Sequence, residues 1–404
     1  MTPDRRILVD ISEFAANPMR TGIQRLVLHT ILDWPEPSTL RLAVIDEAAR
    51  LRYLPDSYAG LMRGYFASAD DDPEIRERLR RAAEAVSEPV PVAEVLAHRA
   101  LLVPELFYRD ARLTFHMDVL RRAPDFTFAV FIDWFIWLHP EWREQGVAVW
   151  TAEYLDFARA VKHASFISER TRREYLTRIL RAERPTGPVL VLGGDGLGTA
   201  APAFDPARRG FLFCGSIEPR KNVAALLDAF AALWAEGCEA ELTLAGRIAT
   251  ADPGILGRLH ALQDGQPRFR HVNNPSDAEM RALIQGSRAT VYPCLSEGFG
   301  IPPLESLSLG VPVIVAADVP SVGCIAAHGQ VRLPEPTAAA IADAVRAFMD
   351  DDAARRITGE IARLTLPRWN GVAAALADWI AEARPRGVRA AADAPYGAPT
   401  GAAG

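Results

Sequence analysis

The sequence has 404 residues, of which 49% are hydrophobic, and it carries a formal net charge of −6. This length allows two domains of ordinary size, each with enough apolar residues for a sizeable core. The acidic balance, with arginines scattered among acids, argues against a partner made of nucleic acid.

Cysteine usage and apolar runs indicate where the protein works. Its four cysteines lie far apart and show none of the spacings typical of metal sites, which suits a reducing cytosol. The longest apolar run, residues 126–138, contains Asp133 and is shorter than the roughly 20 residues that a membrane-spanning helix needs. The apolar run near the N-terminus is too short for a signal peptide and is interrupted by Asp10. We therefore expect a cytoplasmic protein.

The first half of the chain alternates short apolar runs with helical patterns. RILVD predicts a strand that leads into the helix TGIQRLVLHTIL, and TLRLAVID predicts a second strand. Residues 73–86 carry apolar side chains three and four positions apart, so we expect an inserted amphipathic helix there. FTFAVFID, ASFIS and PVLVLG predict three further strands, with helices between them.

The second half shows the same alternation more clearly. Its apolar runs predict strands that alternate with helical patterns, and these runs are FLFCGS, AELTLAG, RFRHVN, ATVYPC and VPVIVA. Most of these runs are apolar at successive positions and do not alternate with polar residues, which is typical of a parallel sheet covered by helices on both faces. Ser276 and Glu279 predict a capping box at the start of one of the helices.

Composition marks the boundaries between these parts. Residues 193–210 are rich in Gly, Pro and Ala and predict an interdomain linker, and residues 385–404 predict a disordered tail. We predict an α/β protein with two Rossmann-like domains, residues 1–200 and 205–366, that face each other across a cleft. A C-terminal helix at 367–384 would follow and could return to the first domain.

The stretch SEGFGIPPLE lies between a predicted strand and a predicted helix. Glycines at such a turn let the backbone approach a ligand, and the N–H groups of a helix N-terminus favour anions. Gly298, Phe299 and Gly300 are therefore well placed to bind a phosphate. Glu297 and Glu305 are poor phosphate ligands but good acceptors for sugar hydroxyls; the helix dipole alone would explain Glu305 but not Glu297. The combination suits a nucleotide sugar, in which a diphosphate lies between two sugars.

EGFGIPPLE resembles the E-x7-E motif of the retaining glycosyltransferases of family 4, which have the two-domain GT-B fold. The resemblance continues through GSIEPRKNVAALLDAF, LTLAGR, SDAEM and GVPVIVA, covers most of residues 205–345, and is fainter in TGIQR and FIDWFIWLHPEW. It implies transfer of a sugar from a nucleotide-sugar donor, with retention of configuration, to a glycan, lipid-linked or other acceptor in polysaccharide or glycoconjugate synthesis. It implies no cofactor and no metal.

The resemblance also implies roles for particular residues. Glu297 would contact hydroxyls of the donor sugar, and Glu305 would contact the ribose. Lys221 and Arg220 would neutralise the diphosphate. Lys221 is notable in the composition as well, because the chain has only one other lysine, Lys162. The further residues expected to bind the donor are Gly22, Ser216, Arg247, Asn273, Gly298, Phe299, Gly300 and Ile301.

Transfer of this kind builds up positive charge on the sugar ring and negative charge on the leaving phosphate. Lys221, Arg220 and the N–H groups of a helix N-terminus can stabilise that negative charge without a metal ion. Gly22 opens the first helix of the first domain and would supply a second such N-terminus, although Thr21 and Gln24 also predict an ordinary capping box.

Two positions depart from the family pattern. The family usually has His-Asp where this chain has Ile132 and Asp133, so a histidine contact to the donor sugar is missing, while Asp133 remains a candidate catalytic residue that positions the reactants. The family more often has glutamate where this chain has Cys324. His116 and His139 are candidate substitutes for the histidine. The departures keep an alternative open, namely a non-catalytic subunit that binds nucleotide sugars or scaffolds a glycan-assembly complex.

The acceptor side has fewer signals. Seven aromatic residues in 126–142 would either pack in the core or, from Trp134 to Trp142, line an acceptor groove. Similar enzymes often elongate lipid-linked glycans at the cytoplasmic membrane, so peripheral contact with its inner face is a further expectation, although no basic amphipathic helix supports it. A metal-dependent transferase would need an Asp-x-Asp motif after a buried strand, and Asp70–Asp72 has no such strand directly before it.

Overall fold

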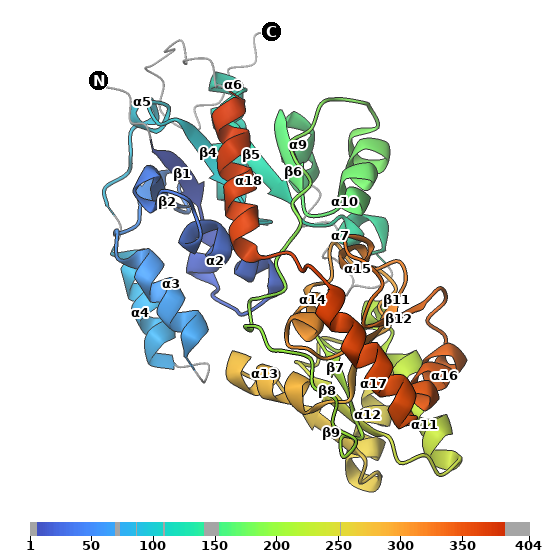
Figure 1. The fold of residues 1–404 in the computed structure, drawn as a ribbon. Helices are drawn as coiled ribbons and strands as arrows, with labels where there is room; N and C mark the ends of the chain where they lie inside the picture. The colour runs from blue at the N-terminus through green and yellow to red at the C-terminus, as the bar shows by residue number, and fades with distance from the viewer. Residues whose placement is uncertain are drawn as a thin grey trace. The chain divides into compact units, whose positions relative to one another are not determined.

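A computed structural model describes residues 6–68, 73–85, 87–107, 110–140, 153–250 and 252–383. The chain divides into two units: Met1–Leu190 with Asn370–Gly404 form the first, and Val191–Trp369 form the second (Figure 1). The stretch 193–210, predicted as an interdomain linker, lies within the second unit. The predicted tail 385–404, Trp142 and Asp70–Asp72 lie outside the described residues.

The first unit is built around a six-stranded sheet with the order β3-β2-β1-β4-β5-β6. All neighbours pair in parallel except β2 and β3, which are antiparallel at one edge. Strands β1, β4 and β5 are buried along their whole length, as expected for central strands covered on both faces. The strands are β1 (Ile7–Asp10), β2 (Leu40–Ile45), β3 (Leu51–Tyr53), β4 (Ala100–Val103), β5 (Thr127–Phe131) and β6 (His163–Phe166).

Helices follow most of these strands, and one comes from the far end of the chain. The inserted helix predicted at 73–86 is confirmed as α4. Helix α18 lies beside β5 (Figure 1). It buries Val372, Leu376 and Ile380, and its Trp379 packs on Phe128 of β5 with ring centroids 4.9 Å apart. The helices of this unit are α1 (Ser12–Ala16), α2 (Gly22–Leu32), α3 (Tyr58–Ala67), α4 (Pro73–Glu84), α5 (Val92–Val95), α6 (Asp110–Arg122), α7 (Phe135–Leu138), α9 (Tyr154–Ala160), α10 (Glu169–Glu174) and α18 (Trp369–Glu382).

The second unit contains a six-stranded parallel sheet with the order β12-β11-β10-β7-β8-β9. Phe211 and Phe213 of β7 join the core under α11 and α16, whereas Leu212 and Cys214 join a second core with Ile284 of α13. Its strands are β7 (Gly210–Cys214), β8 (Glu241–Ala245), β9 (Phe269–Val272), β10 (Ala289–Tyr292), β11 (Val313–Ala316) and β12 (Gln330–Leu333). Its helices are α11 (Val223–Ala235), α12 (Pro253–Gly265), α13 (Asp277–Gly286), α14 (Ile301–Ser308), α15 (Pro320–Gly323), α16 (Ala338–Met349) and α17 (Asp351–Glu360).

Each sheet has the strand order of a Rossmann fold, with the fourth strand of the unit beside the first. The predicted fold class, two Rossmann-like α/β domains, is confirmed, and so is the capping box at Ser276 and Glu279. The strand predicted at PVLVLG is wrong, because Val189 forms only an isolated bridge to Phe166. Strands β3, β4 and β12 were not predicted.

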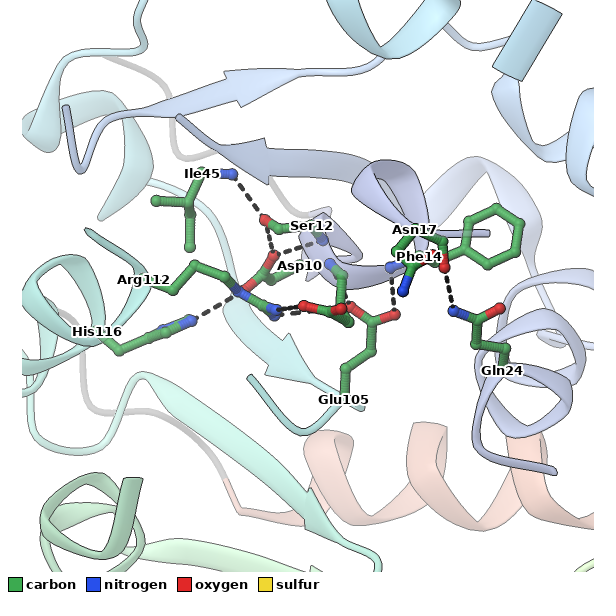
Figure 2. Close-up of polar contacts among 10 residues, drawn as sticks. Asp10, Ser12, Phe14, Asn17, Gln24, Ile45, Glu105, Arg112 and His116 are labelled. Carbon is green, nitrogen blue, oxygen red and sulfur yellow. Dashed lines mark hydrogen bonds and ion pairs between the residues drawn. The ribbon is translucent and has the colours of Figure 1, made fainter. Parts of the chain in front are cut away.

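A network of buried charged residues lies at the carboxyl ends of β1 and β4 (Figure 2). Asp10, Glu105, Arg112 and His116 are each at most 1% exposed. Arg112 Nη2 donates to Asp10 Oδ2 at 2.8 Å, and His116 Nε2 contacts the same oxygen at 2.9 Å. Burial opposes the charge of Asp10, yet Arg112 and His116 hold its pKa below the ordinary value. Burial also lowers the pKa of His116. The idea that His116 replaces the sugar-binding histidine is wrong, because its ring is fully buried and bound to Asp10.

Glu105 links this network to the chain that follows β1 (Figure 2). Its two carboxylate oxygens accept the N–H groups of Glu13 and Phe14, at 3.0 and 2.9 Å, at the start of α1. Burial raises the pKa of Glu105 to about 8, and Asp10 adds to this, although Arg112 and the two backbone donors favour the charged form. The buried Glu105 side chain therefore holds the start of α1 on the sheet.

The capping box predicted at Thr21 and Gln24 forms only in part. Thr21 Oγ1 accepts Gln24 N–H at 3.4 Å, but the Gln24 side chain turns away from Thr21. Its Nε2 donates to Asn17 O at 2.8 Å (Figure 2). Its Oε1 accepts Met19 N–H. Gln24 thus ties the end of α1 to the start of α2, where Gly22 lies.

Candidate functional site

The candidate site lies at one edge of the second unit's sheet, where β7, β8, β9 and β10 end. Because parallel strands all end at the same edge, the residues that follow them lie in neighbouring loops. Ser216 follows β7, Arg247 follows β8, Asn273 follows β9 and Glu297 follows β10. The strand order reverses between β7 and β10, which is where open α/β sheets leave room for a ligand.

The turns after β7 and β8 lie against each other, and glycine makes this approach possible. Gly246 has a φ of +153°, and a Cβ atom there would lie 2.0 Å from the carbonyl oxygen of Gly215. Ile217 N–H donates to Arg247 O at 2.9 Å and joins the two turns. Ser216 and Arg247 therefore stand in adjacent segments, and Arg247 is exposed.

A short 3₁₀ turn, Pro219–Lys221, brings two cations to this edge. Arg220 and Lys221 are 8% and 7% exposed. Asn222 follows in the left-handed conformation, with a φ of 57°, and turns the chain into α11. Asn222 is the N-cap residue of α11, but its side chain caps no helical N–H; its Nδ2 donates to Pro336 O at 2.8 Å instead.

Glu297 is the centre of the contacts at this edge. Its Oε1 atom accepts hydrogen bonds from Lys221 Nζ and, at 2.8 Å, from Tyr292 Oη, and it lies 2.9 Å from Arg220 Nη1. Cys294 Sγ lies 3.3 Å from the same oxygen. Within the described part of the chain, no hydrogen bond reaches Glu297 Oε2. The carboxylate is therefore held by one oxygen, and the other can accept a ligand hydroxyl.

The cluster has a strong effect on its acidic groups. Burial alone would raise the pKa of Glu297, but Lys221 and Arg220 outweigh it and lower that pKa to about 2. Burial and the Glu297 charge raise the pKa of Tyr292 well above its ordinary value and that of Cys294 to about 12. At neutral pH Glu297 is thus an anion, while Tyr292 and Cys294 are neutral donors.

Three residues in this cluster were not singled out from the sequence: Tyr292, Cys294 and Glu218. Lys221 Nζ donates to Tyr292 Oη at 2.7 Å, and Arg220 Nη2 donates to Glu218 Oε1 at 2.9 Å. Ser216 Oγ donates to the same Glu218 oxygen at 2.8 Å. The sequence contained one signal for Tyr292. It carries a hydroxyl group, and it is the last residue of an apolar strand that lies just before the stretch SEGFGIPPLE.

The glycine-rich turn leads into α14 as predicted. Gly300 is the N-cap of α14 with a φ of +87°, and a Cβ atom there would lie 2.5 Å from Val319 Cγ1. Gly298, Phe299 and Gly300 are buried, and their N–H groups donate no hydrogen bond to other described residues. Ile301 opens the helix, and Glu305 follows one turn later at 7% exposure. The turn thus presents backbone donors beside Glu297.

The remaining candidates lie in the first unit. Gly22 is the exposed first residue of α2, and Asp133 is half-buried two residues after the end of β5. His139 is half-buried at the end of α7. The prediction that Trp134 lines an acceptor groove is wrong, because this side chain is fully buried and its Nε1 donates to Thr171 O at 3.0 Å.

No group of three or more His, Cys, Asp or Glu side chains that could hold a metal ion lies among the described residues. In the same part of the chain, every helix is too short or too polar to cross a membrane.

Acid is expected to weaken the second unit through Glu297. Its folded pKa of about 2 lies below the ordinary 4.5, so the unfolded chain binds the proton first as the pH falls. The stabilisation is full above pH 4.5 and is lost toward pH 2, by at most about 1.4 kcal/mol per pH unit. Urea unfolding of wild type and Glu297→Gln measures this. The difference between them should shrink from pH 5 to pH 3 and stay constant from pH 6 to pH 8; a constant difference throughout would contradict the expectation.

Parts of this chain are similar in sequence to known glycosyltransferases. Residues 200–365 match the family model described as "Glycosyl transferases group 1". The serotype-specific mannosyltransferase WbdA of Escherichia coli is 25% identical over 348 residues, which cover 78% of this chain and 39% of WbdA. The O-antigen chain mannosyltransferase B of E. coli is 31% identical over 141 residues, 35% of this chain and 37% of that protein. The chain therefore spans about two fifths of the length of these relatives.

Solved structures show the fold. Anabaena HepE, crystallised with UDP and glucose, superposes with a TM-score of 0.59 at 13% identity, over 94% of this chain and 97% of HepE. Sucrose-phosphate synthase from Thermosynechococcus elongatus gives a TM-score of 0.62 at 14% identity, over 94% and 98%. The resemblance to GT-B glycosyltransferases is confirmed, whereas membership of family 4 stays a prediction.

Proposed function

We propose that this chain is a retaining glycosyltransferase that moves a sugar from a nucleotide-sugar donor to a glycan, lipid-linked or other acceptor, in the synthesis of a polysaccharide or glycoconjugate. The observation that carries the proposal is the cluster of Lys221, Arg220 and Glu297 beside the turn 298–300. Two cations and several backbone donors suit a diphosphate, and the open oxygen of Glu297 suits a sugar hydroxyl. The family match over the same residues supports this assignment.

The chain's own groups can supply the stabilisation that such a transfer needs. As the bond between sugar and phosphate breaks, negative charge gathers on the diphosphate, next to Lys221, Arg220 and the start of α14. Glu297 Oε2 would hold a hydroxyl of the sugar, and Glu305 would hold the ribose. Gly22 and Asp133 remain candidates for a phosphate contact and for positioning the reactants. These roles need no metal ion, so we propose a metal-independent reaction.

The relatives suggest what to test first. Several are described as mannosyltransferases, so a mannosyl donor is the first sugar to examine. We propose that the enzyme works in the cytoplasm, and at the inner face of the membrane if its acceptor is lipid-linked.

A thermal-shift panel of nucleoside diphosphates and nucleotide sugars, each with EDTA and with magnesium, tests the proposed donor site. A ligand at 100 times its dissociation constant should add about 2.7 kcal/mol of stability. We expect one base to stabilise the protein equally under both conditions. Stabilisation by no nucleotide at all would contradict the proposal and favour the scaffolding alternative.

Turnover then separates an enzyme from a non-catalytic binder. We expect the protein to release nucleoside diphosphate from the donor that the panel identifies, faster than the uncatalysed rate. Binding without any release, in the presence of glycan acceptors, would favour a non-catalytic subunit instead.

A further inference from the structure

The charges of the candidate donor site cancel one another. Lys221 and Arg220 supply two cations, and Glu297 and Glu218 supply two carboxylates. Glu297 lies within ion-pair distance of both cations, and Glu218 within ion-pair distance of Arg220. All four side chains are at most 20% exposed. Attraction between charges is stronger at such a site than at an open surface, because little water separates them. The site is therefore built from cations that are already neutralised.

Glu297 occupies the donors that an incoming phosphate would need. Lys221 Nζ donates to Glu297 Oε1 and to Tyr292 Oη. Arg220 Nη1 lies 2.9 Å from the same carboxylate oxygen. Arg220 has further partners: its Nη1 donates to Ser296 O at 2.8 Å, and its Nη2 donates to Glu218 Oε1 at 2.9 Å. A phosphate oxygen that binds either cation must therefore share it with Glu297 or displace that carboxylate.

We propose that Glu297 competes with the diphosphate for Lys221 and Arg220, and that this competition promotes release of the nucleoside diphosphate product. The inference rests on the proposed function, in which this site binds a nucleotide sugar. When the donor is bound, the diphosphate weakens the ion pairs of Glu297 with Lys221 and Arg220. A hydrogen bond from a sugar hydroxyl to Glu297 Oε2 offsets that loss. Once the sugar has been transferred, that hydroxyl leaves, and Glu297 regains both cations at the expense of the product.

The competition predicts an effect opposite to that of a simple binding residue. Removing the charge of Glu297 should strengthen the binding of a nucleoside diphosphate, although it removes a contact to the donor sugar. Isothermal titration calorimetry with UDP, GDP, ADP and inorganic diphosphate measures this for wild type and Glu297→Gln. We expect the dissociation constant of the diphosphate that wild type binds to fall about tenfold in the variant. An unchanged or higher dissociation constant would overturn the inference.

A matched control separates this effect from a general change in charge. Asp228 pairs with Arg258 at 2.7 Å, and both side chains are about half exposed, so Asp228→Asn removes one paired negative charge away from the site. Its dissociation constant should equal that of wild type. Glu297→Asp keeps the charge but shortens the side chain, and should give a smaller gain; it serves as the second variant if Glu297→Gln does not fold, as judged by its melting curve.

The outcomes distinguish this inference from the proposed function. Binding by wild type without tightening in Glu297→Gln or Glu297→Asp overturns only the competition. Absence of binding in wild type and in all variants removes the proposed donor site and the inference together.

Discussion

Replacing Lys221 with alanine is expected to lower the rate of sugar transfer by about 100- to 1,000-fold, the loss typical when a group that stabilises developing charge is removed. The amine lies at the sheet edge where the strand order reverses, beside Glu297 and the turn 298–300. Without it, the charge on the leaving diphosphate would be met by Arg220 and backbone donors alone. Initial rates of nucleoside diphosphate release, with saturating donor, measure the effect.

The chain provides a matched control, because Lys162 is its only other lysine. Lys162 is 53% exposed and pairs with Asp125 at 3.1 Å, so Lys162→Ala should keep the wild-type rate. Glu297→Ala should lose transfer as Lys221→Ala does, because it removes the acceptor for a sugar hydroxyl. Near wild-type rates in both site variants, with folded protein, would show that the site has been assigned wrongly.

Replacing Arg112 with methionine is expected to destabilise the first unit by about 3 to 5 kcal/mol. Methionine fills much of the same space but leaves Asp10 and Glu105 buried without a cation. Arg112 Nη2 lies 2.8 Å from the Asp10 carboxylate and 3.6 Å from that of Glu105, and its side chain is 1% exposed. Urea unfolding, monitored by hydrogen exchange of the backbone amides in β1 and β4, measures the stability of this unit alone.

An exposed arginine in the same unit shows what burial contributes. Arg80 pairs with Glu77 and Glu84 on the surface of α4 and is 55% exposed, so Arg80→Met should change stability by about 1 kcal/mol or less. A loss as small as this in Arg112→Met would mean that the buried network is not required to hold α1 against the sheet.

The two networks have a common position in their sheets. Asp10 ends the first strand of the first unit and Glu105 follows the fourth, while the Lys221 turn and Glu297 follow the first and fourth strands of the second. In the first unit the four side chains of the network are at most 1% exposed, so a ligand cannot reach them, although Arg112 Nη1 and His116 Nδ1 have no hydrogen-bond partner within the described part of the chain. In the second, one carboxylate oxygen and three backbone N–H groups have no partner among the described residues. That difference is why the second cluster, and not the first, is the candidate ligand site.

Local sequence was enough to predict most of the second unit. Runs such as ATVYPC and VPVIVA are short and almost wholly apolar, and they form buried parallel strands, because a strand covered on both faces must be apolar along its length. The glycine-rich turn before α14 was likewise predicted, since glycine and proline at a strand end favour a tight turn into a helix, whereas the roles of Glu297 and Lys221 stay predictions.

Only the tertiary structure decided which distant residues meet. Lys221 and Glu297 lie 76 positions apart, and they pair because β10 lies beside β7 in the sheet, an order that no local periodicity encodes. The same holds for β4, a four-residue run that becomes a central strand through its neighbours β1 and β5. His116 was a candidate substitute for the histidine that is missing at Ile132. Asp10, 106 positions earlier, and the aromatic rings around His116 make it a buried structural residue instead. The charge and polarity of each residue can be read from the sequence. Which distant residues it contacts depends on the order of the strands in the sheet, and only the fold determines that order.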